Sequence, residues 1–79
     1  MTIYECTALT GGGANALDAL NVANLVDQDI AFVTASAMIY FFRFNATATD
    51  AENTAIHPYR IRPDDYVDEG VWEEYMAAI

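Results

Sequence analysis

The sequence predicts a mainly β fold. We expect one small domain over residues 1–79: an antiparallel sheet or half-barrel of three to five strands, with at most one short helix. The longest apolar run, DIAFVTASAMIYFFRFN at residues 29–45, is rich in β-branched and aromatic residues and breaks once, as a central hairpin does. Shorter alternating segments stand near both ends, and glycine, proline and small polar residues fill the remainder.

Length and composition favour association with other copies. A chain of 79 residues buries only about 60–65% of its unfolded surface, so a single core is marginal without a disulfide, a metal or a partner. Cys6 is the single cysteine, which excludes an internal disulfide, and His57 is the single histidine. Because 54% of the residues are hydrophobic, a homo-oligomer is the expected source of additional burial.

The charge excludes some partners. Twelve acidic residues stand against three arginines and no lysine, for a net charge of −9. This charge argues against nucleic acid and anionic membranes as partners, and we expect the acids to form turns and a solvated rim. No signal peptide is visible in MTIYECTALTGGG, and no run reaches the roughly 18–20 apolar residues of a membrane span.

The N-terminal third predicts a strand, a break and a segment that fits two conformations. Residues 2–9 alternate as a strand whose buried side carries Tyr4, Cys6 and Ala8. Gly11–Gly13 is a flexible break. Residues 14–25 fit either a short helix or an irregular segment. In the second case its apolar side chains are pinned to the hairpin: Leu17, Leu20, Val22 and Leu25.

The hairpin at 29–45 has its turn at Ser36–Ala37, which pairs Ala35 with Met38, Val33 with Tyr40 and Ala31 with Phe42. Both of its faces are mostly apolar, and a two-stranded ribbon cannot cover itself. We expect one face to be the core and the other to contact another subunit. The hypothetical interface draws on the aromatic strand: Ile39, Tyr40, Phe41, Phe42 and Phe44. The alternative is a monomer in which residues 14–25 and the loop 46–69 cover both faces.

Residues 46–69, broken by two prolines, predict a long loop that packs through Ile56, Tyr59 and Ile61. Residues 70–76 predict a last strand, with Trp72 closing the core.

No catalytic, metal or cofactor site is expected. His57 has no nucleophile near it in sequence, and the acids lack EF-hand spacing. A non-enzymatic role is therefore predicted. A carbohydrate- or receptor-binding module is the alternative, with Tyr59, Tyr66 and Trp72 as stacking platforms and hydroxyl hydrogen bonds accepted by Asp64 and Asp65.

The order of features from Leu17 to Glu74 resembles a short module of bacteriophage and prophage tail and tail-fibre proteins. The segments that carry this resemblance are ALDAL, DQDIAFV, MIYFFRFNATAT, AEN, IRPDD and GVWEE. The resemblance implies a β-structured structural protein, often trimeric, without enzymatic activity. It also implies other virion proteins as possible partners, and a place in the virion or, before assembly, in the host cytoplasm.

Overall fold

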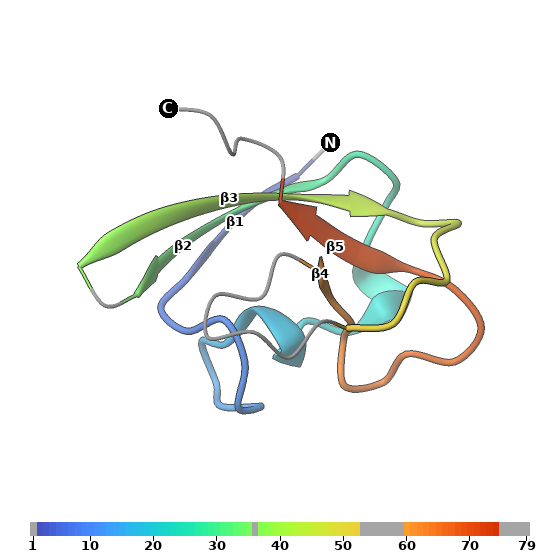
Figure 1. Cartoon of the computed structure of the whole chain (residues 1–79), viewed down its shortest axis with the longest axis horizontal. Coiled ribbons are helices and arrows are strands. Elements are labelled where there is room, and N and C mark those ends of the chain that lie inside the picture. The colour runs from blue at the N-terminus through green and yellow to red at the C-terminus, as the bar shows by residue number, and fades with distance from the viewer. Residues whose placement is uncertain (1, 36, 53–59, 75–79) are drawn as a thin grey trace.

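The computed structural model describes residues 2–35, 37–52 and 60–74. It confirms a mainly β fold with one open sheet of five strands in the order β1-β2-β3-β5-β4 (Figure 1). The strands are β1 (Ile3–Cys6), β2 (Ile30–Ala35), β3 (Met38–Asn45), β4 (Arg60–Ile61) and β5 (Val71–Glu74).

The sheet is mostly antiparallel, as expected, and β1 and β2 form a parallel pair within it. The cause is the long connection between them, because parallel neighbours need a crossover and cannot be joined by a tight turn. β4 also lies inside the segment predicted as a loop at 46–69. It is only two residues long and pairs with β5 alone, so it leaves little periodic signal in the sequence.

The hairpin has the predicted register. Ala35 pairs with Met38, Val33 with Tyr40 and Ala31 with Phe42. Ala37 adopts φ +62°, in the left-handed region typical of two-residue hairpin turns. Ser36, the other predicted turn residue, lies outside the described residues.

The short helix allowed for residues 14–25 is wrong. The structure has two three-residue 3-10 turns there, η1 (Leu17–Ala19) and η2 (Val22–Asn24). Both are followed by extended backbone at Leu20 and Leu25, and in neither does the side chain of the N-cap residue make a capping hydrogen bond, so no α-helix propagates. The irregular alternative describes this segment better. No helix in the described parts of the chain is long and apolar enough to cross a membrane.

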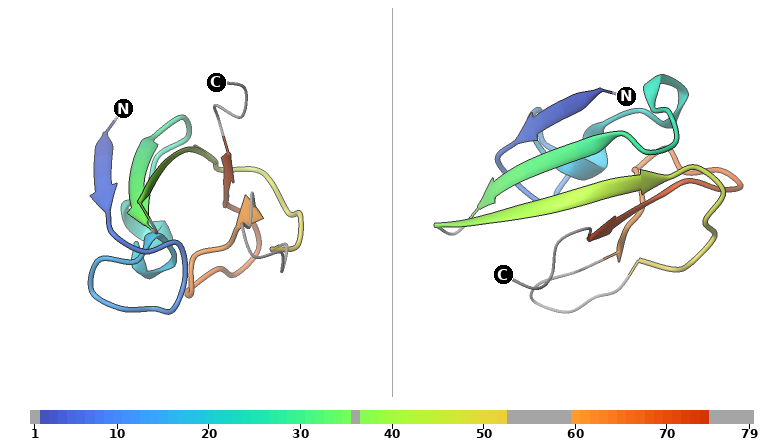
Figure 2. Two further views of the ribbon diagram at one scale, coloured as in Figure 1. Left: turned by 60° about the vertical axis from the view of Figure 1, so that its left-hand side comes forward. Right: turned by 90° about the horizontal axis from the view of Figure 1, so that it is seen from above.

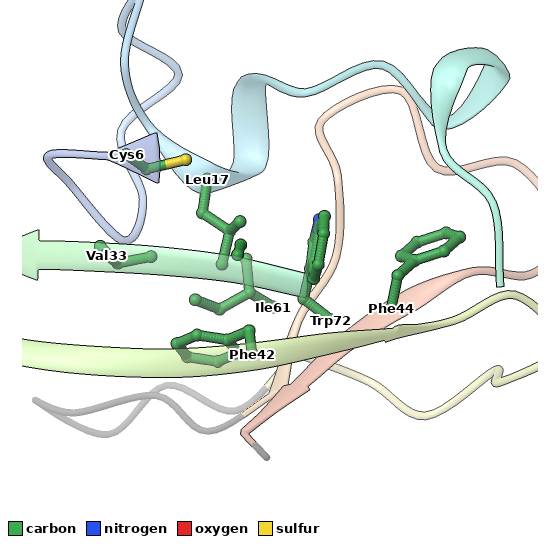
Figure 3. Packing of buried hydrophobic residues seen from close by; sticks show 8 residues of the cluster. Cys6, Leu17, Val33, Phe42, Phe44, Ile61 and Trp72 are labelled. Carbon is green, nitrogen blue, oxygen red and sulfur yellow. The ribbon is translucent and has the colours of Figure 1, made fainter. Parts of the chain in front are cut away.

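In the described residues the curved sheet is covered mainly on one side, although Val71 at the start of β5 is fully buried on the other side. The chain from 7 to 25 and the loop from 62 to 70 lie below the strands in Figure 1, and the view from above in Figure 2 looks onto the other side. The core forms between them. Leu17 projects from η1 toward the sheet residues (Figure 3). The members of the core are Cys6, Leu17, Ala31, Val33, Phe42, Phe44, Ile61 and Trp72.

Trp72 lies at the centre of an aromatic group in this core. Its ring is 6.3 Å from that of Tyr4, edge-on, and 5.3 Å from that of Phe44. Gly70 lies against Phe44 so closely that a Cβ on Gly70 would be 2.7 Å from the ring. The predictions that Cys6 is buried and that Trp72 closes the core are confirmed, with exposures of 4% and 0%.

Candidate functional site

The candidate site is the uncovered side of the sheet, which we call the outer face. It consists of the strand side chains that point away from the core. These are Ile3, Glu5, Ile30, Phe32, Thr34, Ile39, Phe41, Arg43, Asn45, Arg60, Glu73 and the fully buried Val71. The alternation of side chains along each strand places them there, because every second residue of β2 and β3 is directed into the core.

One half of the outer face is apolar. Phe32 and Phe41 are cross-strand partners on β2 and β3, with ring centroids 4.9 Å apart in an edge-to-face arrangement. Ile39 is 59% exposed and Ile3 is 54% exposed, while Phe32 is 37% exposed. These side chains lie on neighbouring strands, and exposed apolar side chains gathered on one face are a feature of interaction sites.

The other half of the outer face is a row of charges. Arg43, Glu73 and Arg60 follow one another on β3, β5 and β4 as direct cross-strand partners. Arg43 Nη2 is 4.0 Å from Glu73 Oε1, and the side-chain amide of Asn45 donates to the same oxygen over 3.4 Å. A partly exposed pair at this long distance contributes little to stability. Its effect is to set the local charge of the face.

A hollow of about 340 Å³ opens where β1 ends and β2 continues. Phe32, Thr34 and Ile39 line it from the sheet, with Glu5 and Thr7 on the β1 side. It has an apolar floor at the margin of the outer face. No group of three or more metal-binding side chains is found among the described residues, in this hollow or elsewhere.

The five residues of the predicted oligomer interface lie on two different sides of the sheet. Phe42 and Phe44 belong to the core, with exposures of 0% and 2%, and Tyr40 packs against that core. These three therefore do not share a surface with Ile39 and Phe41, which lie on the outer face. The sequence showed two apolar faces of the hairpin. The face of the hairpin that becomes covered is the one against which Leu17 and the loop 62–70 pack, and these contacts form only in the folded chain.

The structure describes two of the three aromatic residues of the alternative stacking set, Tyr66 and Trp72. An exposed platform at Trp72 is wrong, because its side chain is fully buried. One side of the Tyr66 ring is covered by the Arg62 guanidinium, 4.1 Å from its centroid. The Tyr66 hydroxyl donates to the Asp68 carbonyl over 3.0 Å. Tyr59 and Ile56 lie outside the described residues. Ile61 packs in the core as predicted.

Arg62 and its neighbours hold the two loops together. Its guanidinium donates to the carbonyls of Thr49 over 2.7 Å and Asp50 over 3.0 Å. Its backbone N–H donates to Glu52 over 2.9 Å. These bonds join residues 49–52 to the start of the loop 62–70. Arg62 is therefore a structural residue of the covered side.

Two buried carboxylates were missed by sequence reasoning. Asp29, 1% exposed, accepts from the backbone N–H groups of Thr2 over 2.7 Å and Val26 over 2.8 Å. Asp18, 5% exposed, accepts from those of Gly11 over 3.1 Å and Gly12 over 3.0 Å. The signal was present, because an aspartate beside a turn or a glycine break commonly binds nearby backbone N–H groups.

The remaining acids of the alternative site also serve the fold. The Asp65 carboxylate accepts from the N–H of Val22 over 3.1 Å, and the Asp64 N–H donates to the carbonyl of Asp18 over 2.7 Å. Desolvation, and then the charge of Asp18, raise the pKa of the Asp64 carboxyl. A hydrogen bond from the Ala46 N–H, 2.9 Å from Asp27 Oδ1, is the main cause that lowers the pKa of Asp27.

The fold and the outer face define a small open-sheet β domain with one uncovered apolar side. No family model, no curated protein and no solved structure matches this chain.

Proposed function

We propose that this protein is a non-enzymatic assembly module that associates with copies of itself through the outer face. The setting we propose is a phage or prophage virion appendage, with a trimer as the preferred assembly. Support for the setting comes from the resemblance between Leu17 and Glu74 to tail and tail-fibre modules. Support for self-association comes from the described structure.

The single observation that carries the proposal is the exposure of Ile3, Phe32 and Ile39 together on one side of the sheet. Fully burying such a side chain from complete exposure contributes about 1.5–3 kcal/mol. Each of the three is already about half buried, so association would gain roughly half of that amount from each of them. In a chain of 79 residues the core is small, and a second copy supplies the additional burial that the fold needs.

Light scattering on the purified chain tests the proposal. We expect a mass above 8.7 kDa at micromolar concentration, decreasing on dilution. Ile39→Asp places a charge on the outer face and is expected to shift the protein toward the monomer. Val67→Asp is the matched control, since Val67 is 77% exposed in the loop on the covered side. A wild-type species that stays at 8.7 kDa would end the self-association proposal.

The virion setting has its own test. The strain that carries the gene is induced to release phage, and the phage particles are purified. An antibody against the chain is expected to detect it in these particles. Detection in the cell lysate but not in particles would contradict the setting and leave self-association to be judged by light scattering.

A further inference from the structure

Charge is distributed unevenly over the fold, and this distribution affects how copies of the chain approach one another. The outer face carries Glu5, Glu73, Arg43 and Arg60, so its two acids and two arginines balance. The other ten acids and Arg62 account for the whole net charge of −9. All of these charged residues are in the described part of the chain.

None of those ten acids projects from the outer side of a strand. Glu74 belongs to the core-facing set of β5, as the pairing of Phe42 with Glu74 shows. The others lie in the turns, loops and η1: Asp18, Asp27, Asp29, Asp50, Glu52, Asp64, Asp65, Asp68 and Glu69. The loop 62–70, with four of them, lies on the covered side (Figure 1).

We infer that ionic strength regulates the association of copies through the outer face, because the excess negative charge of the chain lies around this contact and opposes it at low salt. This inference rests on the proposed function and adds its regulation. Two copies that approach with their covered sides bring like charges together and repel each other. On the outer face the same copies present apolar side chains and balanced charges. A basic partner, in contrast, would be attracted to the covered side.

The direction of this salt dependence follows from the position of the charges. The excess charges flank the contact instead of crossing it, so their repulsion opposes association at low ionic strength. Raising the salt shortens the Debye length from about 10 Å at 0.1 M to about 3 Å at 1 M, which screens that repulsion. Association through the outer face should therefore strengthen with NaCl. An interface held by opposite charges weakens under the same conditions.

The experiment measures the dissociation constant by sedimentation equilibrium between 0.05 and 1 M NaCl, for the wild type and for Asp68→Asn/Glu69→Gln. Both residues are exposed in the loop 62–70, and no hydrogen bond of either side chain is recorded in the described structure. We expect the double variant to associate more tightly than the wild type at low salt, with the difference closing at high salt. A general salt effect on apolar contacts would change the dissociation constants of the wild type and the double variant equally. A difference between the two constants that disappears at high salt therefore indicates charge screening. Ile39→Asp should weaken association at every salt concentration.

The outcomes separate the two proposals. No association at any salt concentration would refute the proposed function and this inference with it. Self-association that weakens as salt rises, or that is unaffected by the Asp68→Asn/Glu69→Gln change, would overturn the inference and leave the proposed self-association standing. Self-association that Ile39→Asp does not weaken would refute the outer face as the contact surface, and with it both proposals.

Discussion

Replacing Asp29 tests whether buried carboxylates hold this fold together. Asp29→Ala removes the acceptor for two short backbone hydrogen bonds, from Thr2 at 2.7 Å and Val26 at 2.8 Å. It leaves those N–H groups without their partner at a site where the original side chain is 1% exposed. A hydrogen bond to a charged group contributes about 1.5–3 kcal/mol, and the two are not independent, so we expect a loss of about 3 kcal/mol.

This loss is large for a small domain, whose total stability lies near the lower end of about 5–15 kcal/mol. The position of Asp29 explains the size of the effect. Thr2 precedes β1 and Val26 precedes β2, so one carboxylate joins the starts of two parallel neighbours that are far apart in sequence. Asp29→Asn keeps one acceptor oxygen and is expected to lose about half as much.

Urea unfolding followed by Trp72 fluorescence is the assay, since the single tryptophan of the chain is fully buried. Asp68→Ala is the control, because it removes one acidic charge from an exposed loop position. Measurements at several protein concentrations separate folding from association. If the free energy of unfolding of Asp29→Ala lay within about 0.5 kcal/mol of that of Asp68→Ala, the structural role of the carboxylate would be refuted.

Three further changes probe the covered side of the sheet by the same assay. Leu17→Ala should destabilise by about 2–5 kcal/mol, because the side chain is fully buried and leaves a cavity; a cost below about 1 kcal/mol would contradict its place in the core. Gly70→Ala should cost more than about 1 kcal/mol, since φ is +109° and the new Cβ would be 2.7 Å from the ring of Phe44; an unchanged midpoint would exclude that close approach. Asp64→Asn should stabilise at neutral pH. The folded pKa of Asp64 is raised, by desolvation and then by the charge of Asp18, so its contribution is favourable at low pH and is lost as pH rises through that pKa. The gain should vanish in acid, and a gain that is equal at all pH values would contradict this cause.

The hairpin could be predicted because its determinants are local. Side chains alternate with a period of two, and a two-residue break then sets which residues face each other, so Val33 opposite Tyr40 follows from the sequence alone. Burial of Trp72 could be predicted from its size and from the alternation of the last strand.

The parts that sequence reasoning missed depend on contacts between distant segments. The partner of Asp29 at Thr2 is 27 residues away, and no local pattern marks that pair. The two residues of β4 have a defined place only because β5 pairs with them. The choice between the two apolar faces of the hairpin likewise depends on Leu17, whose neighbours in sequence favour neither side.

The acidic composition has two separate effects in this fold. Asp18, Asp29 and Asp65 bind backbone N–H groups of turns, so part of the negative charge stabilises the connections between strands. Because those connections lie in the loops and on the covered side, the same charge is absent from the outer face. The charges that the outer face does carry are two acids and two arginines, which balance, so this face lacks the net negative charge of the rest of the chain. The proposed association of acidic copies through the outer face depends on that balance.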